Sequence, residues 1–156
     1  MEGELKIGKV TDPVWLGKLG PEIKTFAEKL NLPTITYETL FTYFANTVQF
    51  GESAGDKIQF WMVYQDDGGF TPVAFAHWFV CGLPHRGVVF ADFIYSWNRM
   101  REPVVMLLDK FVKFGIENHA PIYKGTAINE TVFRVFRKAA SKRQANGART
   151  SRTSIG

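Results

Sequence analysis

The chain has 156 residues, of which 46% are hydrophobic and 15% aromatic, with 14 phenylalanines. This length and composition predict one globular domain whose core is rich in aromatic rings. The acidic start, MEGELKIG, lacks the apolar region of a secretory signal peptide, and no apolar run approaches the ~20 residues that cross a bilayer, so no membrane association is expected. The single cysteine, Cys81, excludes an intramolecular disulfide and predicts a buried thiol in a reducing, cytoplasmic compartment.

The net charge of +4 is unevenly distributed. Seven of the 19 basic residues and none of the 15 acidic residues follow Phe133, which leaves 12 basic and 15 acidic residues, a net charge of −3, before it. Such a basic tail either binds a phosphate-bearing or acidic partner or only keeps the chain soluble, and both interpretations stay open. The residues expected to contact a protein partner or nucleic acid are Arg137, Lys138, Lys142, Arg143, Arg149 and Arg152.

The first half of the chain predicts a strand, two helices and another strand. Residues 5–10 form the first strand, which Asp12-Pro13 breaks. Helical spacing of apolar residues predicts a helix over 21–32 and a second over 37–50. Residues 57–65 form an aromatic, β-branched strand that ends in the turn Asp-Asp-Gly-Gly.

Two apolar runs within residues 71–97 flank a short loop containing Gly82, Pro84 and Gly87, which predicts an antiparallel hairpin. A turn centred between Pro84 and His85 gives paired residues on one face of the hairpin. These pairs are His77 with Asp92, Phe79 with Phe90, Phe75 with Ile94, and Cys81 with Val88. The opposite face carries Trp78, Ala76, Val80, Ala91, Phe93 and Tyr95. Both faces are apolar, so we expect both to be covered.

The most informative polar feature of this hairpin is the expected contact between His77 and Asp92. One interpretation is a buried structural pair in which the carboxylate fixes the imidazole tautomer. The other is a general base at the floor of a cleft, tuned by burial and by the neighbouring charge. A β-bulge in either strand would shift the register and is expected to separate the pair.

Beyond Trp97 the sequence predicts a helix, a strand and a second helix. The first helix begins near Pro103, which resists a helix interior. Its expected buried stripe consists of Val104, Leu107, Leu108, Phe111, Val112 and Ile116. Residues 122–128 form a strand of the same sheet, and residues 130–142 form the last helix. The domain therefore spans residues 1–142, and residues 143–156 form a basic tail that cannot build a core.

This order of elements from Leu5 to Ala140 resembles the GNAT superfamily of acyl-CoA-dependent N-acetyltransferases. The resemblance implies an α+β fold with a mixed, mostly antiparallel central sheet and about four helices. It implies that the strand ending near Ile94 and Trp97 splays from residues 122–128, with acetyl-CoA in the gap. Amides near Ile94 and Tyr95 would polarise the thioester, and the pyrophosphate would lie at the start of the helix near Pro103, beside Arg99 and Arg101.

The sequence departs from the GNAT pattern in three places. The family's phosphate loop reads Arg/Gln-x-x-Gly-x-Gly/Ala, and only Arg99 matches, because Glu102 and Val104 replace the glycines. Pro103 removes an amide donor, and Arg99 and Arg101 would offset part of this loss. The last helix lacks the tyrosine often used as general acid, and the closing C-terminal strands of a typical member are missing. Short domains with such an altered loop resemble domains encoded by bacteriophages.

Three functions are compatible with these features. The first is an N-acetyltransferase in which Asp92, helped by His77, deprotonates an amine through water. The second is a non-catalytic structural or assembly subunit, in a virion for example, that binds a protein partner or forms a homo-oligomer. The third is nucleic-acid binding by the tail, with an affinity that falls steeply with salt. No spacing of histidine and cysteine indicates a metal site.

Overall fold

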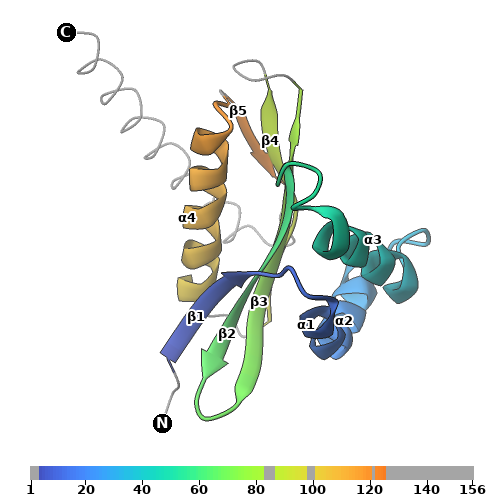
Figure 1. Cartoon of the computed structure of the whole chain (residues 1–156). Helices are drawn as coiled ribbons and strands as arrows, with labels where there is room; N and C mark the ends of the chain where they lie inside the picture. Colours follow the sequence, from blue (N-terminus) through green and yellow to red (C-terminus); the bar gives the residue numbers. More distant parts are fainter. Residues whose placement is uncertain (1–3, 83–86, 98–100, 121, 126–156) are drawn as a thin grey trace, which may run out of the picture.

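The computed structural model describes residues 4–82, 87–97, 101–120 and 122–125, which form a five-stranded sheet with helices on both faces (Figure 1). The strands follow one another across the sheet in chain order, and all neighbours are antiparallel except β4 and β5, which are parallel. The elements are β1 (Glu4–Lys9), α1 (Pro13–Lys18), α2 (Gly20–Leu30), α3 (Tyr37–Phe50), β2 (Ile58–Asp66), β3 (Phe70–Cys81), β4 (Val88–Ser96), α4 (Arg101–Glu117) and β5 (Ile122–Gly125). This architecture confirms the predicted α+β fold with a mostly antiparallel sheet.

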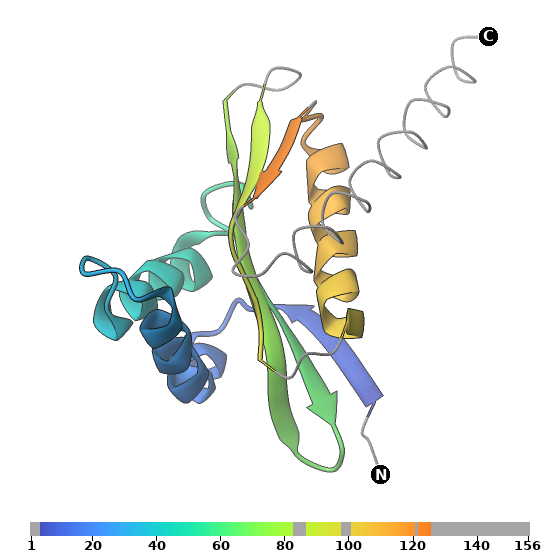
Figure 2. The ribbon, with the colours of Figure 1, turned by 180° about the vertical axis from the view of Figure 1, so that it is seen from behind.

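The two faces of the sheet are covered by different helices, as Figure 2 shows from behind: α1, α2 and α3 on one face and α4 on the other. The core beneath α1–α3 contains a cluster of rings that includes Phe26, Phe44, Phe60 and Phe75. The core beneath α4 is built around Trp78, which contacts Phe111 and Phe114. The expectation of an aromatic core covered on both faces is therefore confirmed.

Side-chain caps explain where α1 and α3 begin. Asp12, in extended conformation, accepts a hydrogen bond from the amide of Val14, and Pro13 occupies the first turn. The pair Asp12-Pro13 therefore begins α1, a short helix that the sequence analysis missed because it took these residues only as a break. Thr36 and Thr39 form a reciprocal capping box at the start of α3.

Helix α4 begins two residues before Pro103, close to the predicted start, and buries most of the predicted stripe. Ile116 is an exception, because its side chain is 48% exposed, while Phe114 is 2% exposed and takes the buried place. The 3.6-residue period explains this: after Phe111 the buried stripe returns at Phe114 and Gly115, not at Ile116. A Cβ at Gly115 would overlap the ring of Tyr123, so the glycine lets β5 lie close to α4.

Other expectations are corrected or lie outside the described residues. Cys81 is the last residue of β3 and is exposed, so the expected burial of its thiol is wrong. The predicted strand over 122–128 is described only as far as Gly125. The predicted helix over 130–142 and the basic tail, with all six basic residues named above, lie outside the described residues. No helix in the described part of the chain is long and apolar enough to cross a membrane.

Candidate functional site

A β-bulge interrupts the central hairpin between β3 and β4. Near the loop the predicted register is confirmed, because Phe79 lies opposite Phe90 and Cys81 opposite Val88. Between His77 and Trp78 the register shifts by one residue. Beyond the shift, His77 lies opposite Phe93, Phe75 opposite Tyr95, and Ala76 opposite Ile94. The predicted ladder pairs of His77 with Asp92 and of Phe75 with Ile94 are therefore wrong.

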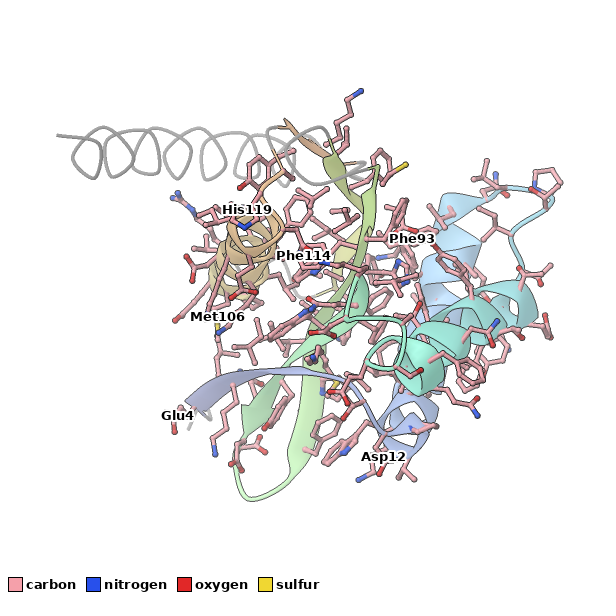
Figure 3. All side chains as sticks on the ribbon, turned by 45° about the horizontal axis from the view of Figure 1, so that its top comes forward. Glu4, Asp12, Phe93, Met106, Phe114 and His119 are labelled. Atoms are coloured by element: carbon pink, nitrogen blue, oxygen red, sulfur yellow. The ribbon has the colours of Figure 1, made fainter. Side chains whose placement is uncertain are left out.

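The extra residue also exchanges the faces of the last part of β4. Phe93 and Tyr95 pack into the cluster beneath α1–α3, and Ile94 packs beneath α4, the reverse of the prediction. Figure 3 shows the labelled Phe93 on the side of α2 and α3, opposite the labelled Phe114. A bulge re-aims side chains in this way because two residues of one strand then share a single partner.

The bulge nevertheless keeps His77 and Asp92 together. The Nδ1 atom of His77 lies 2.6 Å from Oδ1 of Asp92. The Nε2 atom of His77 lies 2.7 Å from the hydroxyl of Thr47 on α3. The hydroxyl of Tyr43, one turn earlier on α3, donates to Oδ2 of Asp92 at 2.6 Å. A hydrogen-bonded chain Thr47–His77–Asp92–Tyr43 thus connects α3 to both strands of the hairpin at the bulge.

His77 and Asp92 differ in solvent exposure and can therefore take different roles. His77 is 0% exposed and both of its ring nitrogens are engaged, so it can hold Asp92 in place but does not reach solvent. The side chain of Asp92 is 16% exposed and is the ionisable group of the pair that a small molecule can approach. An ionised carboxylate only accepts hydrogen bonds, so the Nδ1 proton of His77 donates to Asp92 and the Thr47 hydroxyl can donate to Nε2.

Tyr43 is a hydrogen-bond donor under all ordinary conditions. Partial burial, the hydrogen bond to Asp92 and the charge of that carboxylate together raise the pKa of Tyr43 far above its usual value. The side chain is nevertheless 37% exposed, so its phenol lies at the border between the core and solvent. The phenol therefore holds Asp92 from the outer side while His77 holds it from the inner side.

Strand β5 lies beside the half of β4 that precedes the bulge. Within the described residues, β4 pairs with β5 from Val88 to Ala91, and Figures 1 and 2 both show β5 beside one half of β4. The predicted splay of these strands near Ile94 and Trp97 lies outside the described residues, because β5 is described only as far as Gly125. The amide of Trp97 donates to the carbonyl of Val73 on β3. Since backbone direction alternates along a strand, the amide of Tyr95 also points to β3 and that of Ile94 points away from β3.

The start of α4 carries one of the two arginines that the sequence predicted for phosphate binding. Arg101 is its first residue and is exposed, so its guanidinium can meet an anion. Glu102 follows it in the first turn with a negative charge, and Pro103 offers no amide hydrogen. Arg99 lies outside the described residues.

A pocket of about 180 Å³ lies at the end of β4, against the first turns of α2. It is lined by Pro21, Glu22, Thr25, Tyr95 and Trp97, so it includes two of the residues expected to bind a cofactor. The Oε2 atom of Glu22 and the hydroxyl of Tyr95 are buried, and neither has a hydrogen-bond partner among the described residues. This pocket opens on the same face of the sheet as the network of Asp92.

Sequence reasoning identified His77, Asp92 and the end of β4, but it missed Tyr43, Thr47 and Glu22 as site residues. No local pattern could have identified them, since their partners are between 30 and 73 residues away in the sequence. Among the described residues, no group of three or more His, Cys, Asp or Glu side chains could hold a metal ion.

Solved structures of acetyltransferases share this fold. A predicted acetyltransferase from Clostridium acetobutylicum, solved with acetyl-CoA, has a TM-score of 0.63 and 16% identity, with 86% of this chain and 88% of that chain covered. A ribosomal-protein-alanine N-acetyltransferase from Brucella melitensis has a TM-score of 0.60 and 14% identity, with 86% and 89% covered. AAC(6')-Iy with a CoA-linked bisubstrate analogue has a TM-score of 0.55 and 15% identity, with 88% and 89% covered. The chain therefore has a GNAT-like acetyltransferase fold.

Comparison of the amino-acid sequence found no relatives. No protein-family model matches it, and no curated protein is significantly similar to it in sequence. The fold similarity rests on the arrangement of helices and strands.

Proposed function

We propose that the protein is an acetyl-CoA-dependent N-acetyltransferase whose reaction takes place where β4 and β5 part. One observation carries the proposal: the bulge in β4 leaves Asp92 partly exposed, with its two carboxylate oxygens held by His77 and Tyr43. The bulge thus presents an oriented carboxylate on the last half of β4, where the strands of this fold are expected to part. The GNAT-like fold supports this reading, because structural neighbours include acetyltransferases solved with acetyl-CoA or a CoA-linked analogue.

The residues at the end of β4 and on α4 only partly fit acetyl-CoA. The amide of Ile94, which points away from β3, can donate to a carbonyl oxygen, and Arg101 can bind a phosphate. Glu102 repels a pyrophosphate and Pro103 withholds a donor, so we expect weaker cofactor binding than a glycine-rich helix start would give. Acetyl-CoA would supply a thioester, whose carbonyl carbon is attacked by an amine while the thiolate leaves.

The side chains of this protein would then handle the amine's proton. Asp92 accepts it, directly or through one water, when the nitrogen forms its bond to carbon. His77 and Tyr43 hold the two carboxylate oxygens and fix their direction, so both are positioning residues. An amide donor at Ile94 stabilises the oxyanion that develops during attack.

Binding and turnover of acetyl-CoA test this function. Acetyl-CoA and free CoA should each raise the melting temperature of the full chain, because a ligand that binds only the folded state stabilises it. Transfer to an amine should be followed by mass spectrometry of the product. A thiol reagent is unsuitable for the wild-type chain, because the exposed Cys81 would react as well. Neither a melting shift nor an acetylated product from a panel of amines would contradict the proposal.

The first turn of α4 favours a second candidate, a non-catalytic use of the same fold as a structural or assembly subunit. Glu102 and Pro103 stand where an acyl-CoA enzyme needs phosphate-binding amides. In that case the double variant Glu102→Gly, Pro103→Gly should bind CoA where the wild-type chain does not. A wild-type chain that binds CoA as well as this variant would contradict the second candidate.

A further inference from the structure

We propose that the pocket at the end of β4, lined by Pro21, Glu22, Thr25, Tyr95 and Trp97, binds an ammonium group of the acceptor. The acceptor is then a diamine, with one amine acetylated beside Asp92 and the other held in this pocket. This proposal rests on the proposed acetyltransfer for its first amine, whereas the pocket itself can be tested without acetyl-CoA.

Two residues that line the pocket have a buried polar atom without a hydrogen bond among the described residues. Tyr95 is only 5% exposed, yet its hydroxyl has no hydrogen-bond partner among the described residues. The Oε2 atom of Glu22, across the pocket, is buried in the same condition. Buried polar groups in folded proteins are nearly always hydrogen-bonded, so two such atoms at one cavity indicate a ligand that supplies the missing donors.

The chemistry of the lining favours a cation over an anion. The backbone amides at the start of α2 would attract an anion, but Glu22 places its carboxylate in that first turn. The rings of Tyr95 and Trp97, whose centroids lie 5.5 Å apart, supply the aromatic part of the lining. Lys29 of the same helix places its Nζ atom 5.3 Å from the centre of the Tyr95 ring, so the Glu22 carboxylate has to offset this positive charge when an ammonium binds.

An ammonium group matches this lining better than a neutral group does. Its N–H donors can engage the Glu22 carboxylate and the Tyr95 oxygen at once, while its charge faces the ring of Trp97. The hydroxyl of Thr25 donates to the carbonyl of Pro21 at 3.1 Å, so its oxygen can still accept a hydrogen bond but carries no charge to attract the ammonium. The volume of about 180 Å³ suits one end of a small molecule rather than a whole cofactor.

The position of the pocket relative to Asp92 sets the distance between the two amines of the acceptor. Asp92 and Tyr95 lie on the same face of β4. Because of the bulge, the β3 residues opposite them are His77 and Phe75, which are two residues apart, or about 7 Å along a strand. A flexible chain with an amine at each end can span this distance. A monoamine can reach only one of the two sites, so the arrangement selects a diamine.

The first experiment measures binding without acetyl-CoA. Cadaverine, a diamine, is titrated into the full chain by calorimetry, with pentanol as the uncharged probe of the same carbon skeleton. We expect cadaverine to bind, pentanol not to bind, and Glu22→Gln to weaken cadaverine about tenfold or more, because a charge-assisted hydrogen bond is lost. Glu28→Gln, an exposed glutamate of the same helix that does not line the pocket, should leave the affinity unchanged. Equal affinities for the wild-type chain and Glu22→Gln, or no binding of cadaverine, would overturn the proposal.

The second experiment compares turnover of cadaverine and pentylamine. We expect kcat/KM to be at least about tenfold higher for cadaverine, and Glu22→Gln to lower it to the pentylamine value without changing pentylamine itself. Equal values for both amines in the wild-type chain would overturn the diamine assignment. If no amine is acetylated but cadaverine binding still depends on Glu22, the cation pocket stands and the acetyltransferase function fails.

Discussion

His77 and Asp92 touch through Nδ1 and Oδ1 at 2.6 Å, although His77 lies opposite Phe93 in the strand ladder. The contact exists because the bulge places Asp92 beside Phe93 over the same residue of β3. The same bulge turns Phe93 and Tyr95 to the face of the sheet that α1–α3 cover. One irregularity of the backbone therefore creates the polar network and aims Tyr95 at the pocket beside α2.

The carboxylate of Asp92 should be necessary for proton removal. Asp92→Asn keeps the shape of the side chain but removes its basicity, so kcat/KM for amine acetylation should fall about 10²- to 10⁴-fold. The affinity for acetyl-CoA, measured by calorimetry, should stay the same. Asp67→Asn, in the exposed turn before β3, is the matched control. Full activity of Asp92→Asn would remove Asp92 from the mechanism.

The amide of Ile94 should matter more than its side chain. Ile94→Pro and Ile94→Ala both shorten a buried side chain, but only proline removes the N–H that points away from β3. We expect a kcat about 10²- to 10³-fold lower for Ile94→Pro than for Ile94→Ala, provided that near-UV circular dichroism shows both folded. Equal kcat values in the two variants would show that this amide does not contact the reacting carbonyl.

Thr47 and His77 should be coupled in stability. Thr47→Val leaves Nε2 of a fully buried His77 without its partner, which should cost about 1–3 kcal/mol of unfolding free energy in denaturant titrations. In the background of His77→Leu, the same change should cost little, because no ring nitrogen remains to be satisfied. Thr25→Val, at an exposed site on α2, should change stability by less than about 0.5 kcal/mol. If the losses of unfolding free energy caused by Thr47→Val and His77→Leu simply add in the double variant, the hydrogen bond between the two side chains is contradicted.

Tyr43 should lose its phenol proton only at a pH well above the usual pKa of tyrosine. Burial, followed by the hydrogen bond and the charge of Asp92, raises its pKa, so the folded state keeps the proton at a pH where the unfolded chain, near pH 10, loses it. The folded state then binds more protons, and stability falls as the pH rises above about 10. Spectrophotometric titration should show one phenol fewer at the highest pH values for Tyr43→Phe.

The stability of Tyr43→Phe should decline less steeply above pH 10 than that of the wild-type chain. Tyr123 also has a pKa raised by burial, so Tyr123→Phe serves as the comparison in the same titration. Identical pH profiles for Tyr43→Phe and the wild-type chain would contradict the contact with Asp92.

The amino-acid sequence alone determined the elements of this fold and the identity of its central polar pair. Periodicity placed α3, β3, β4 and the start of α4 to within a few residues, because apolar spacing and turn residues act locally. It also marked His77 and Asp92, since polar residues on apolar strands stand out. Periodicity missed α1, which is only six residues long. It also assigned Ile116 to the buried stripe of α4, because residues at the border of a helical stripe differ only slightly in angular position from buried ones.

Only the tertiary structure decided how the site is assembled. A bulge depends on packing over the whole sheet, so the reversal of Phe93, Ile94 and Tyr95 between the two faces has no local signal. The same holds for Tyr43 and Thr47, which come to the hairpin from a helix, and for Glu22, which meets Tyr95 across a pocket. Contacts between distant segments follow from how the layers pack, and no spacing within a single element records them.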